Sequence, residues 1–511
     1  MKESRTSNVI KNSFASLMLK IVGIFVQFVM RTAFIYLLGN EYTGISGLFT
    51  DVLNVLSLME MGLDTSMVYA LYKPLAENDE KKIAALMNFY KVAFRVIGIV
   101  VFVAGMLCLP FLGYIVTDVP NIKENIYLIF IMYVLTSASS YFLIYKSILL
   151  RADQKSRIIS KWSAIIQMLE CIVEILLLFL YRQFFTYLVV HFLATLIKNL
   201  VLSSVSTKMY PQYFKEKGIK LEKRETAILF RDIMCLTAYN MSGVIINSTD
   251  SIFISAFVGT VEVAIIGNYT LIINSVRTCV EQIVNAAKPS IGNLAVTSSC
   301  EKQKEIFDKM NFLSFYIACF CCACFYTLLT PFIGNVWLNP SYIISEIIIA
   351  VLIVNFYIAI MVLPVESFRT ANGLFVQGWI RPVIMAGMNI VLDFILGKQW
   401  GIIGILLATT ISRVSTQVWY DSYLIYKRIF LKKPWEYYVD YIVKFIVTLI
   451  VCAITELASK LISVDSAYIN FVCRMLVAVI VPNIVLVLLY HRDENLHQIF
   501  ILIKGKFLRR L

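Results

Sequence analysis

Long apolar segments recur along the chain and are separated by short polar loops. A helix needs about 20 apolar residues to cross roughly 30 Å of hydrocarbon. Segments of this length lie near residues 14–38, 43–71, 83–110, 123–150, 158–181, 183–206, 227–258, 263–287, 305–333, 341–368, 375–397, 401–427, 437–461 and 466–490. The pattern predicts an all-α polytopic membrane protein with about fourteen transmembrane helices.

Composition supports this class of protein. Of the 511 residues, 59% are hydrophobic and 15% are charged, and the mean hydropathy is +0.77. A soluble globular chain of this size is much less apolar. The loops on the predicted outer side are short, so they leave no room for an extracytoplasmic catalytic domain, and we do not expect an enzyme.

The net charge of +13 reflects membrane topology. Lys and Arg collect in the cytoplasmic loops of membrane proteins. Sorting the loop cations by predicted side gives 31 on one side and only Lys123, Arg182, Lys398 and Lys460 on the other. Both termini are therefore predicted to be cytoplasmic, the first helix is expected to remain as an anchor, and nucleic-acid binding is not supported.

Motifs for cofactor chemistry are absent from the sequence. It contains no GxxxxGK[ST] phosphate loop and only three histidines. Cys321 and Cys324 have CxxC spacing inside a predicted span, but no His or carboxylate lies nearby in the sequence to complete a metal shell. We interpret these cysteines as small packing residues and expect neither a metal site nor a cofactor.

An internal repeat predicts two lobes. Residues 37–54 align with 257–274 at an offset of 220, matching Gly39 with Gly259 and Asn54 with Asn274. Short matches farther along occur in the same order, and the offset corresponds to six helices, so the halves have the same orientation. The predicted divisions are an N-lobe (1–207), a cytoplasmic linker (208–226), a C-lobe (227–430), two further helices (431–490) and a basic cytoplasmic tail (491–511).

Charged residues inside the spans are costly and normally face a partner or water. Residues equally far from the turn of a helical hairpin lie at equal depth. This rule places Asp64 level with Lys91 and Glu60 level with Arg95. The same construction places Arg31 level with Asp51 and Glu170 near Lys198.

Two interpretations of these charges remain open. In the first, the charges form structural ion pairs that fix the register of the helices. In the second, they face water: some cations bind an anionic headgroup, and Glu60, Asp64, Lys91 and Arg95 form a gate or ion-coupling site. The cations that suit an anion site are Arg31, Lys198, Arg277 and Arg413. For Arg277 the alternative is pairing with Glu281. For Lys444 and Arg474, near span ends, we expect snorkelling to the interface.

Three blocks carry a family resemblance: "FIYLLGNEYTGISGLFTDVLNVLSLMEMGLDTSMVYALYKPLAENDEKKI" (34–83), "GNYTLIINSVRTCVEQIVNAAKPSIGNL" (267–294) and "ESFRTANGLFVQGWIRPVIMAGMNIVLDFILGKQWGIIGILLATTISR" (366–413). The chain resembles the polysaccharide transporter family, Wzx-type flippases of lipid-linked oligosaccharides within the multidrug/oligosaccharidyl-lipid/polysaccharide (MOP) exporter superfamily. The resemblance implies a V-shaped, MATE-like alternating-access transporter with two six-helix lobes, pseudo-twofold symmetry, two C-terminal helices and a cationic central cavity.

The resemblance also implies a substrate and a location. The substrate would be an undecaprenyl-diphosphate-linked glycan, moved to the outer leaflet of a bacterial cell membrane. The implied partners are the bilayer, a coupling H⁺ or Na⁺, and a polysaccharide polymerase with glycosyltransferases. Arg and Lys in a cavity of low dielectric suit a diphosphate.

One departure concerns the substrate. Related peptidoglycan-precursor flippases place arginines on helices 1, 2 and 8. Arg31 and Arg277 could fill the first and third roles, but helix 2 carries Glu60 and Asp64. This argues against the peptidoglycan precursor. A cation-coupled multidrug or small-molecule exporter of the same superfamily and, less favoured, a membrane glycan polymerase remain as alternatives.

Overall fold

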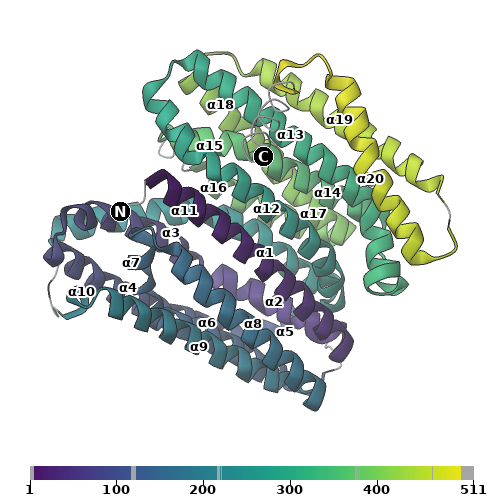
Figure 1. Cartoon of the computed structure of the whole chain (residues 1–511). Helices are drawn as coiled ribbons and strands as arrows, with labels where there is room; N and C mark the ends of the chain where they lie inside the picture. The colour runs from purple at the N-terminus through teal and green to yellow at the C-terminus, as the bar shows by residue number, and fades with distance from the viewer. Residues whose placement is uncertain are drawn as a thin grey trace. The chain divides into compact units, whose positions relative to one another are not determined.

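A computed structural model of the chain describes residues 5–116, 122–215, 219, 221–374, 378, 380–462 and 464–496. It is 89% helical, and the described residues contain no strand. The prediction of an all-α fold is therefore confirmed. In Figure 1 the helices are long and mostly run side by side within each half of the chain.

The chain forms two compact units, residues 1–264 and 265–511, which we call unit 1 and unit 2. The helices of unit 1 are α1 (Arg5–Leu37), α2 (Asn40–Leu56), α3 (Leu58–Glu77), α4 (Glu80–Cys108), α5 (Leu112–Ile115), α6 (Ile126–Ile144), α7 (Ser147–Ala152), α8 (Ser156–Tyr181), α9 (Phe184–Met209), α10 (Gln212–Lys215) and α11 (Lys223–Phe257), with the 3₁₀ turn η1 (Leu109–Phe111). The long helix α12 (Thr260–Thr297) begins in unit 1 and continues into unit 2.

Unit 2 continues with α13 (Cys300–Pro331), α14 (Glu346–Met361), α15 (Leu363–Ala371), α16 (Ile380–Trp400), α17 (Ile402–Ser412), α18 (Ser422–Ile425), α19 (Trp435–Lys460) and α20 (Ala467–Tyr490). Short π or 3₁₀ segments lie between them: η2 (Phe332–Trp337), η3 (Pro340–Tyr342), η5 (Arg413–Asp421) and η6 (Tyr426–Phe430). The pair α19 and α20 packs against α13.

Twelve helical segments among the described residues are long and apolar enough to cross a membrane. The expected spans 43–71 and 227–258 are not among the twelve. Both are helical: the first is divided at Ser57 between α2 and α3, and the second is α11. The two segments contain more polar residues, so the total of fourteen spans stays a prediction.

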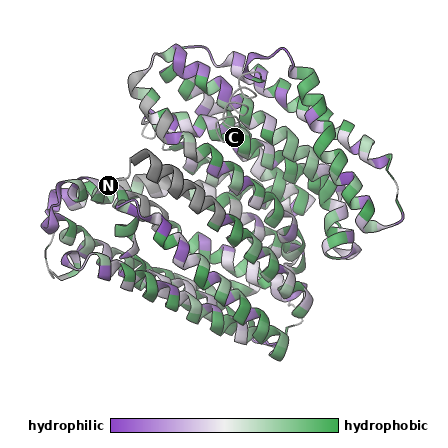
Figure 2. Ribbon diagram, in the orientation of Figure 1, coloured by the Kyte–Doolittle hydropathy of each residue, from purple (hydrophilic) through white to green (hydrophobic). Residues whose placement is uncertain are grey.

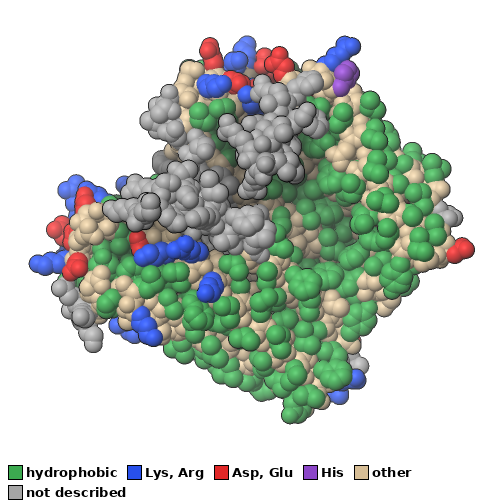
Figure 3. Space-filling view, in the orientation of Figure 1, with side chains coloured by type: hydrophobic (Ala, Val, Ile, Leu, Met, Phe, Trp, Pro, Cys, Tyr) green, Lys and Arg blue, Asp and Glu red, His purple; other side chains and the backbone are tan. Residues whose placement is uncertain are grey.

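Hydrophobic side chains cover the outside of the helices as well as their packed faces. The ribbon coloured by hydropathy is mostly hydrophobic along the helices (Figure 2). In the space-filling view the charged side chains gather mainly at the upper and left margins of the visible face, and much of the rest is hydrophobic (Figure 3). Phe25, Leu107, Phe179 and Leu488 are each more than 60% exposed. Such a surface suits lipid and is consistent with a multi-pass membrane protein.

The packing within unit 1 also includes α11. This helix follows the predicted linker and packs against α2 and α3. The hairpin of α3 and α4 turns at Asn78, which has a left-handed conformation, and at Asp79, whose side chain accepts the N–H of Lys82. The lobe boundaries drawn from the repeat describe internal similarity and stay a prediction.

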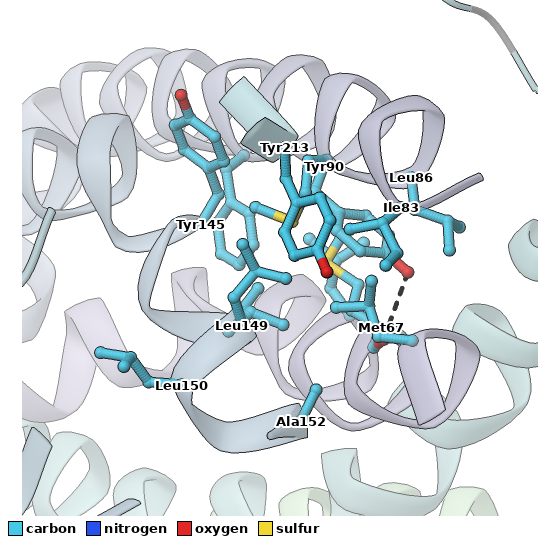
Figure 4. Close-up of a cluster of buried hydrophobic side chains, with 14 of the residues drawn as sticks. Met67, Ile83, Leu86, Tyr90, Tyr145, Leu149, Leu150, Ala152 and Tyr213 are labelled. Atoms are coloured by element: carbon cyan, nitrogen blue, oxygen red, sulfur yellow. Dashed lines mark hydrogen bonds between the residues drawn. The ribbon is translucent and has the colours of Figure 1, made fainter. Parts of the chain in front are cut away.

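A buried cluster at one end of unit 1 joins α3, α4, α7 and α10 (Figure 4). Tyr90 is fully buried, and its hydroxyl donates to the carbonyl of Met67 at 3.2 Å. Tyr145, Leu149 and Tyr213 pack in the same cluster. The hydrogen bond satisfies a polar group that would otherwise be costly to bury.

Nearby, the end of α9 is fixed to the loop between α7 and α8. Tyr210 donates its hydroxyl to Asp153 at 2.6 Å, and Lys155 lies 2.7 Å from the same carboxylate. Burial and the hydrogen bond to Asp153 raise the pKa of Tyr210 above its ordinary value. The hydroxyl therefore stays protonated and acts as the donor.

The tight hairpin of α16 and α17 gives a test of packing. A Cβ on Gly404 would lie 2.0 Å from the carbonyl oxygen of Leu396, whereas a Cβ on Gly387 of α16 would meet nothing within 4 Å. We expect Gly404→Ala to destabilise the protein by about 1–3 kcal/mol, because the backbone must move. Gly387→Ala is the matched control and should leave stability unchanged or slightly higher. Thermal unfolding in detergent measures both, and equal melting temperatures would contradict the close approach.

Candidate functional site

Arg31 on α1 is half-buried and donates its Nη2 to the carbonyl oxygen of Ala264 at 2.8 Å. The predicted neighbour Asp51 instead accepts from Ser248 of α11 at 3.2 Å and from Asn54 at 3.5 Å. The expected Arg31–Asp51 pair is therefore wrong. The depth rule considered only the hairpin of α1 and α2, whereas Asp51 faces a helix that is distant in sequence.

The pairing predicted for Glu170 is also wrong. Its Oε1 lies 2.7 Å from Nδ1 of His191 on α9, and Oε1 of Glu174 lies 3.7 Å from the same nitrogen. The turn between α8 and α9 falls at Arg182 and Gln183, so Glu174 and His191 are equally far from it. Lys198 is seven residues beyond His191, about two helical turns away. The spacing around this turn could have identified His191.

The remaining predicted cations lie on spans of both units. Lys198 on α9 is half-buried, and Arg413, the first residue of η5, is buried. Arg277 on α12 is half-buried, and its Nε donates to Glu281 at 2.7 Å. The pairing considered for Arg277 is therefore present, one helical turn along the same helix.

The predicted gate residues are described only in part. The side chains of Glu60 and Asp64, both on α3, lie outside the described residues. On α4, Lys91 is half-buried and Arg95 is exposed. The turn at Asn78 and Asp79 agrees with the hairpin used in the prediction, but the pairing itself stays a prediction.

A buried ion cluster in unit 2 was not predicted. Asp421 is fully buried and accepts from two arginines: Arg369 of α15 bonds Oδ1, and Arg381 of α16 lies 2.9 Å from Oδ2. Arg369 is only 1% exposed. Three segments of the chain therefore converge on one carboxylate.

The environment of Lys444 on α19 also differs from the prediction. It was expected to snorkel, but it is buried, and its Nζ lies 2.6 Å from Asp440 and 5.7 Å from the ring centre of Phe315. The ion pair and the aromatic ring replace the water that snorkelling would have provided. This arrangement helps to join α19 to α13.

Oxygen donors also gather in the hairpin of α16 and α17. Asn389 donates to Asp393 and to Thr409, both at 3.3 Å, and all three side chains are buried. Carboxylate, amide and hydroxyl oxygens are the donors that hard cations prefer. Glu170, Glu174 and His191 form another group of potential cation ligands, with one ligand atom from each residue lying within 4.8 Å of the others.

The cysteines in α13 lie among packed helices. Cys322 contacts the carbonyl oxygen of Ile353, and Cys324 contacts that of Ala478. The cysteines within the described residues are free thiols. These contacts agree with the interpretation of the CxxC pair as packing residues.

The buried cluster around Asp421 makes a test of stability possible. We expect Asp421→Asn to cost about 3–5 kcal/mol, because Arg369 and Arg381 would lose their shared counter-ion. Glu305→Gln is the control, since Glu305 pairs with Lys302 and Lys309 at an exposed site and should change stability little. Thermal unfolding in detergent provides the comparison, and a neutral Asp421→Asn would show that the cluster is not a structural centre.

Comparison with known proteins gives the family and the fold. A family model described as "Polysaccharide biosynthesis protein" matches residues 9–289, more than half of the chain. No curated protein matches the chain. The structure is similar to a lipid II flippase, MurJ, in an inward closed conformation, with a TM-score of 0.67 at 16% identity, covering 94% of this chain and 99% of that chain.

Multidrug transporters share the same fold. An inward-facing MATE family transporter of the MOP superfamily gives a TM-score of 0.54 at 14% identity, covering 80% of this chain and 97% of that one. An outward-facing MATE family transporter gives 0.55 at 13% identity, covering 82% and 94%. The family match covers more than half of the chain and shows that this chain belongs to the polysaccharide biosynthesis protein family.

Proposed function

We propose that this protein is a flippase that moves an undecaprenyl-diphosphate-linked oligosaccharide from the cytoplasmic to the outer leaflet of a bacterial cell membrane, with both termini in the cytoplasm. The family match over residues 9–289 carries the proposal. The fold supports it, because the lipid II flippase and the MATE transporters are membrane proteins of the same architecture.

Cations within the spans support a substrate with a diphosphate. Arg31, Lys198, Arg277 and Arg413 lie on α1, α9, α12 and η5. Charged side chains at such positions are costly unless they have a partner or a function. A guanidinium group binds a phosphate through several directed hydrogen bonds, and the bond strengthens away from water. We assign these four residues to binding the diphosphate during alternating access.

The glycan proposed is an oligosaccharide for cell-surface polysaccharide. The family name favours this substrate over the peptidoglycan precursor, and so do the two acids of α3, Glu60 and Asp64. A polymerase and glycosyltransferases would act with the flippase, because the translocated unit must be built before flipping and joined afterwards. A coupling H⁺ or Na⁺ would supply the driving force.

A multidrug exporter is the second candidate. Its support is the likeness to MATE transporters, together with the half-buried carboxylate of Asp51 and the buried carboxylate of Asp393 within helices. In this alternative the acids would bind a coupling cation and the arginines would be structural. The exporter would move a cationic dye and leave the lipid-linked glycan in its original leaflet.

A reconstituted transport assay tests the flippase. In proteoliposomes with a labelled undecaprenyl-diphosphate-linked oligosaccharide, we expect Arg31→Ala and Arg277→Ala each to slow translocation at least tenfold, because a diphosphate contact is lost. Arg31→Lys should restore part of the rate, since it retains the charge.

The matched control is Lys460→Ala, because Lys460 is 59% exposed and pairs with Glu456 near a helix end. Its rate should equal that of the wild type. Size-exclusion profiles and melting temperatures establish that each variant is folded. Full translocation by both folded arginine variants would refute the assigned site. Dye transport without translocation of the glycan would favour the exporter.

A further inference from the structure

Three potential metal ligands lie together in the hairpin of α8 and α9. Glu170 and Glu174 are one turn apart on α8, and His191 faces them from α9. Their closest ligand atoms all lie within 4.8 Å of one another. His191 is 37% exposed, Glu170 is 17% exposed and Glu174 is 4% exposed, so the cluster is closed on one side and accessible on the other.

The hydrogen bonds within this cluster leave one ligand atom unsatisfied. Nδ1 of His191 contacts Oε1 of Glu170 at 2.7 Å, and this bond engages the nitrogen. Oε1 of Glu174 is buried and has no hydrogen-bond partner, although it lies 3.7 Å from the same nitrogen. A buried carboxylate oxygen without a donor is costly and normally marks a missing partner.

The electrostatics also favour a bound cation. Among the residues that the structure describes, the only salt bridges of Glu170 and Glu174 are those to His191. A protonated imidazole carries one positive charge, so it cannot neutralise both carboxylates. Two neighbours of the cluster among the described residues are uncharged: Tyr187 stacks on His191 with ring centres 5.9 Å apart, and Gln167 of α8 approaches Gly23 of α1.

The donor types indicate which cation would bind. Imidazole nitrogen with carboxylate oxygen suits a divalent transition metal better than Mg²⁺ or Ca²⁺, which prefer oxygen alone. Zn²⁺ binds N and O ligands at about 2.0–2.2 Å, so ligand atoms in a tetrahedral shell lie roughly 3.3 Å apart. The observed separations of 2.7 and 3.7 Å bracket that value. Small side-chain shifts would therefore complete a three-ligand site.

We propose that Glu170, Glu174 and His191 bind a divalent transition-metal ion, with a fourth position open to water or another ligand. The ion would link α8 to α9 about 10 Å from their shared turn, and it would neutralise the buried carboxylate of Glu174. Binding of the metal does not depend on the proposed flippase function. The two proposals can therefore fail separately.

Zn²⁺ binding to the purified full-length protein is the direct test. After treatment with a chelator, the protein in detergent is titrated with Zn²⁺ by calorimetry, and the bound metal is counted by elemental analysis. We expect the wild type to bind one more Zn²⁺ per chain than Glu174→Gln. We also expect at least a tenfold weaker affinity at the site in His191→Gln, because each variant loses one of three ligands.

Matched variants separate this site from other ligands. The Gln variants retain the eleven cysteines of the wild type, so Zn²⁺ binding to those thiols is common to them and to the wild type. Glu456→Gln removes an acid from α19 and should leave Zn²⁺ binding unchanged. His191→Cys retains three ligands and should still bind Zn²⁺, which guards against a loss caused by misfolding. Co²⁺ should give tetrahedral visible bands with the wild type and not with Glu174→Gln. Equal Zn²⁺ stoichiometry and affinity in the wild type and Glu174→Gln would overturn the proposal.

Discussion

The cost of placing charge among apolar helices constrains this structure more than any other single factor. An ionised side chain that leaves water loses several kcal/mol of solvation, and it persists only with a partner, a bound ion or access to water. Asp421 meets this requirement with two arginines, and Lys444 meets it with Asp440 and an aromatic ring. Each solution joins segments that are far apart in sequence. The buried charges therefore also determine which helices pack together.

The fold could be predicted largely because the length of a hydrophobic segment is a local property. Twelve helices pass the test of length and apolarity within the described part of the chain. Helix α2 is too short at 17 residues, because the segment is divided at Ser57, and α3 and α11 carry polar residues; α2 and α3 both pack against α11. The contact between Asp51 and Ser248 is one example. Hydropathy alone cannot show that a polar residue in a span has such a partner, since the partner lies almost 200 residues away in the sequence.

The charged pairs were harder to predict, because depth in a hairpin fixes only one coordinate of a side chain. For α8 and α9, placing the turn at Arg182 and Gln183 brings Glu174 level with His191. A placement error of one or two residues was enough to select Lys198 instead. Arg31 donates to a backbone carbonyl on α12, a kind of contact that no charge pattern can reveal. Pairing by charge works where both partners are ionised and adjacent in sequence, as with Arg277 and Glu281.

The polar helices of unit 1 have a consequence for transport. A helix with acids and amides on its surface cannot face lipid along its whole circumference, and Asp51 of α2, which accepts from Ser248 of α11, faces protein. A glycan is polar and strongly hydrated, and its passage requires a surface that replaces part of that water. The lipid tail has no such requirement and can remain in the bilayer. Under the proposed function, the residues that weaken the hydropathy signal of these segments would provide polar contacts for a glycan. An all-apolar set of fourteen helices would insert more easily but would offer a glycan no polar contact.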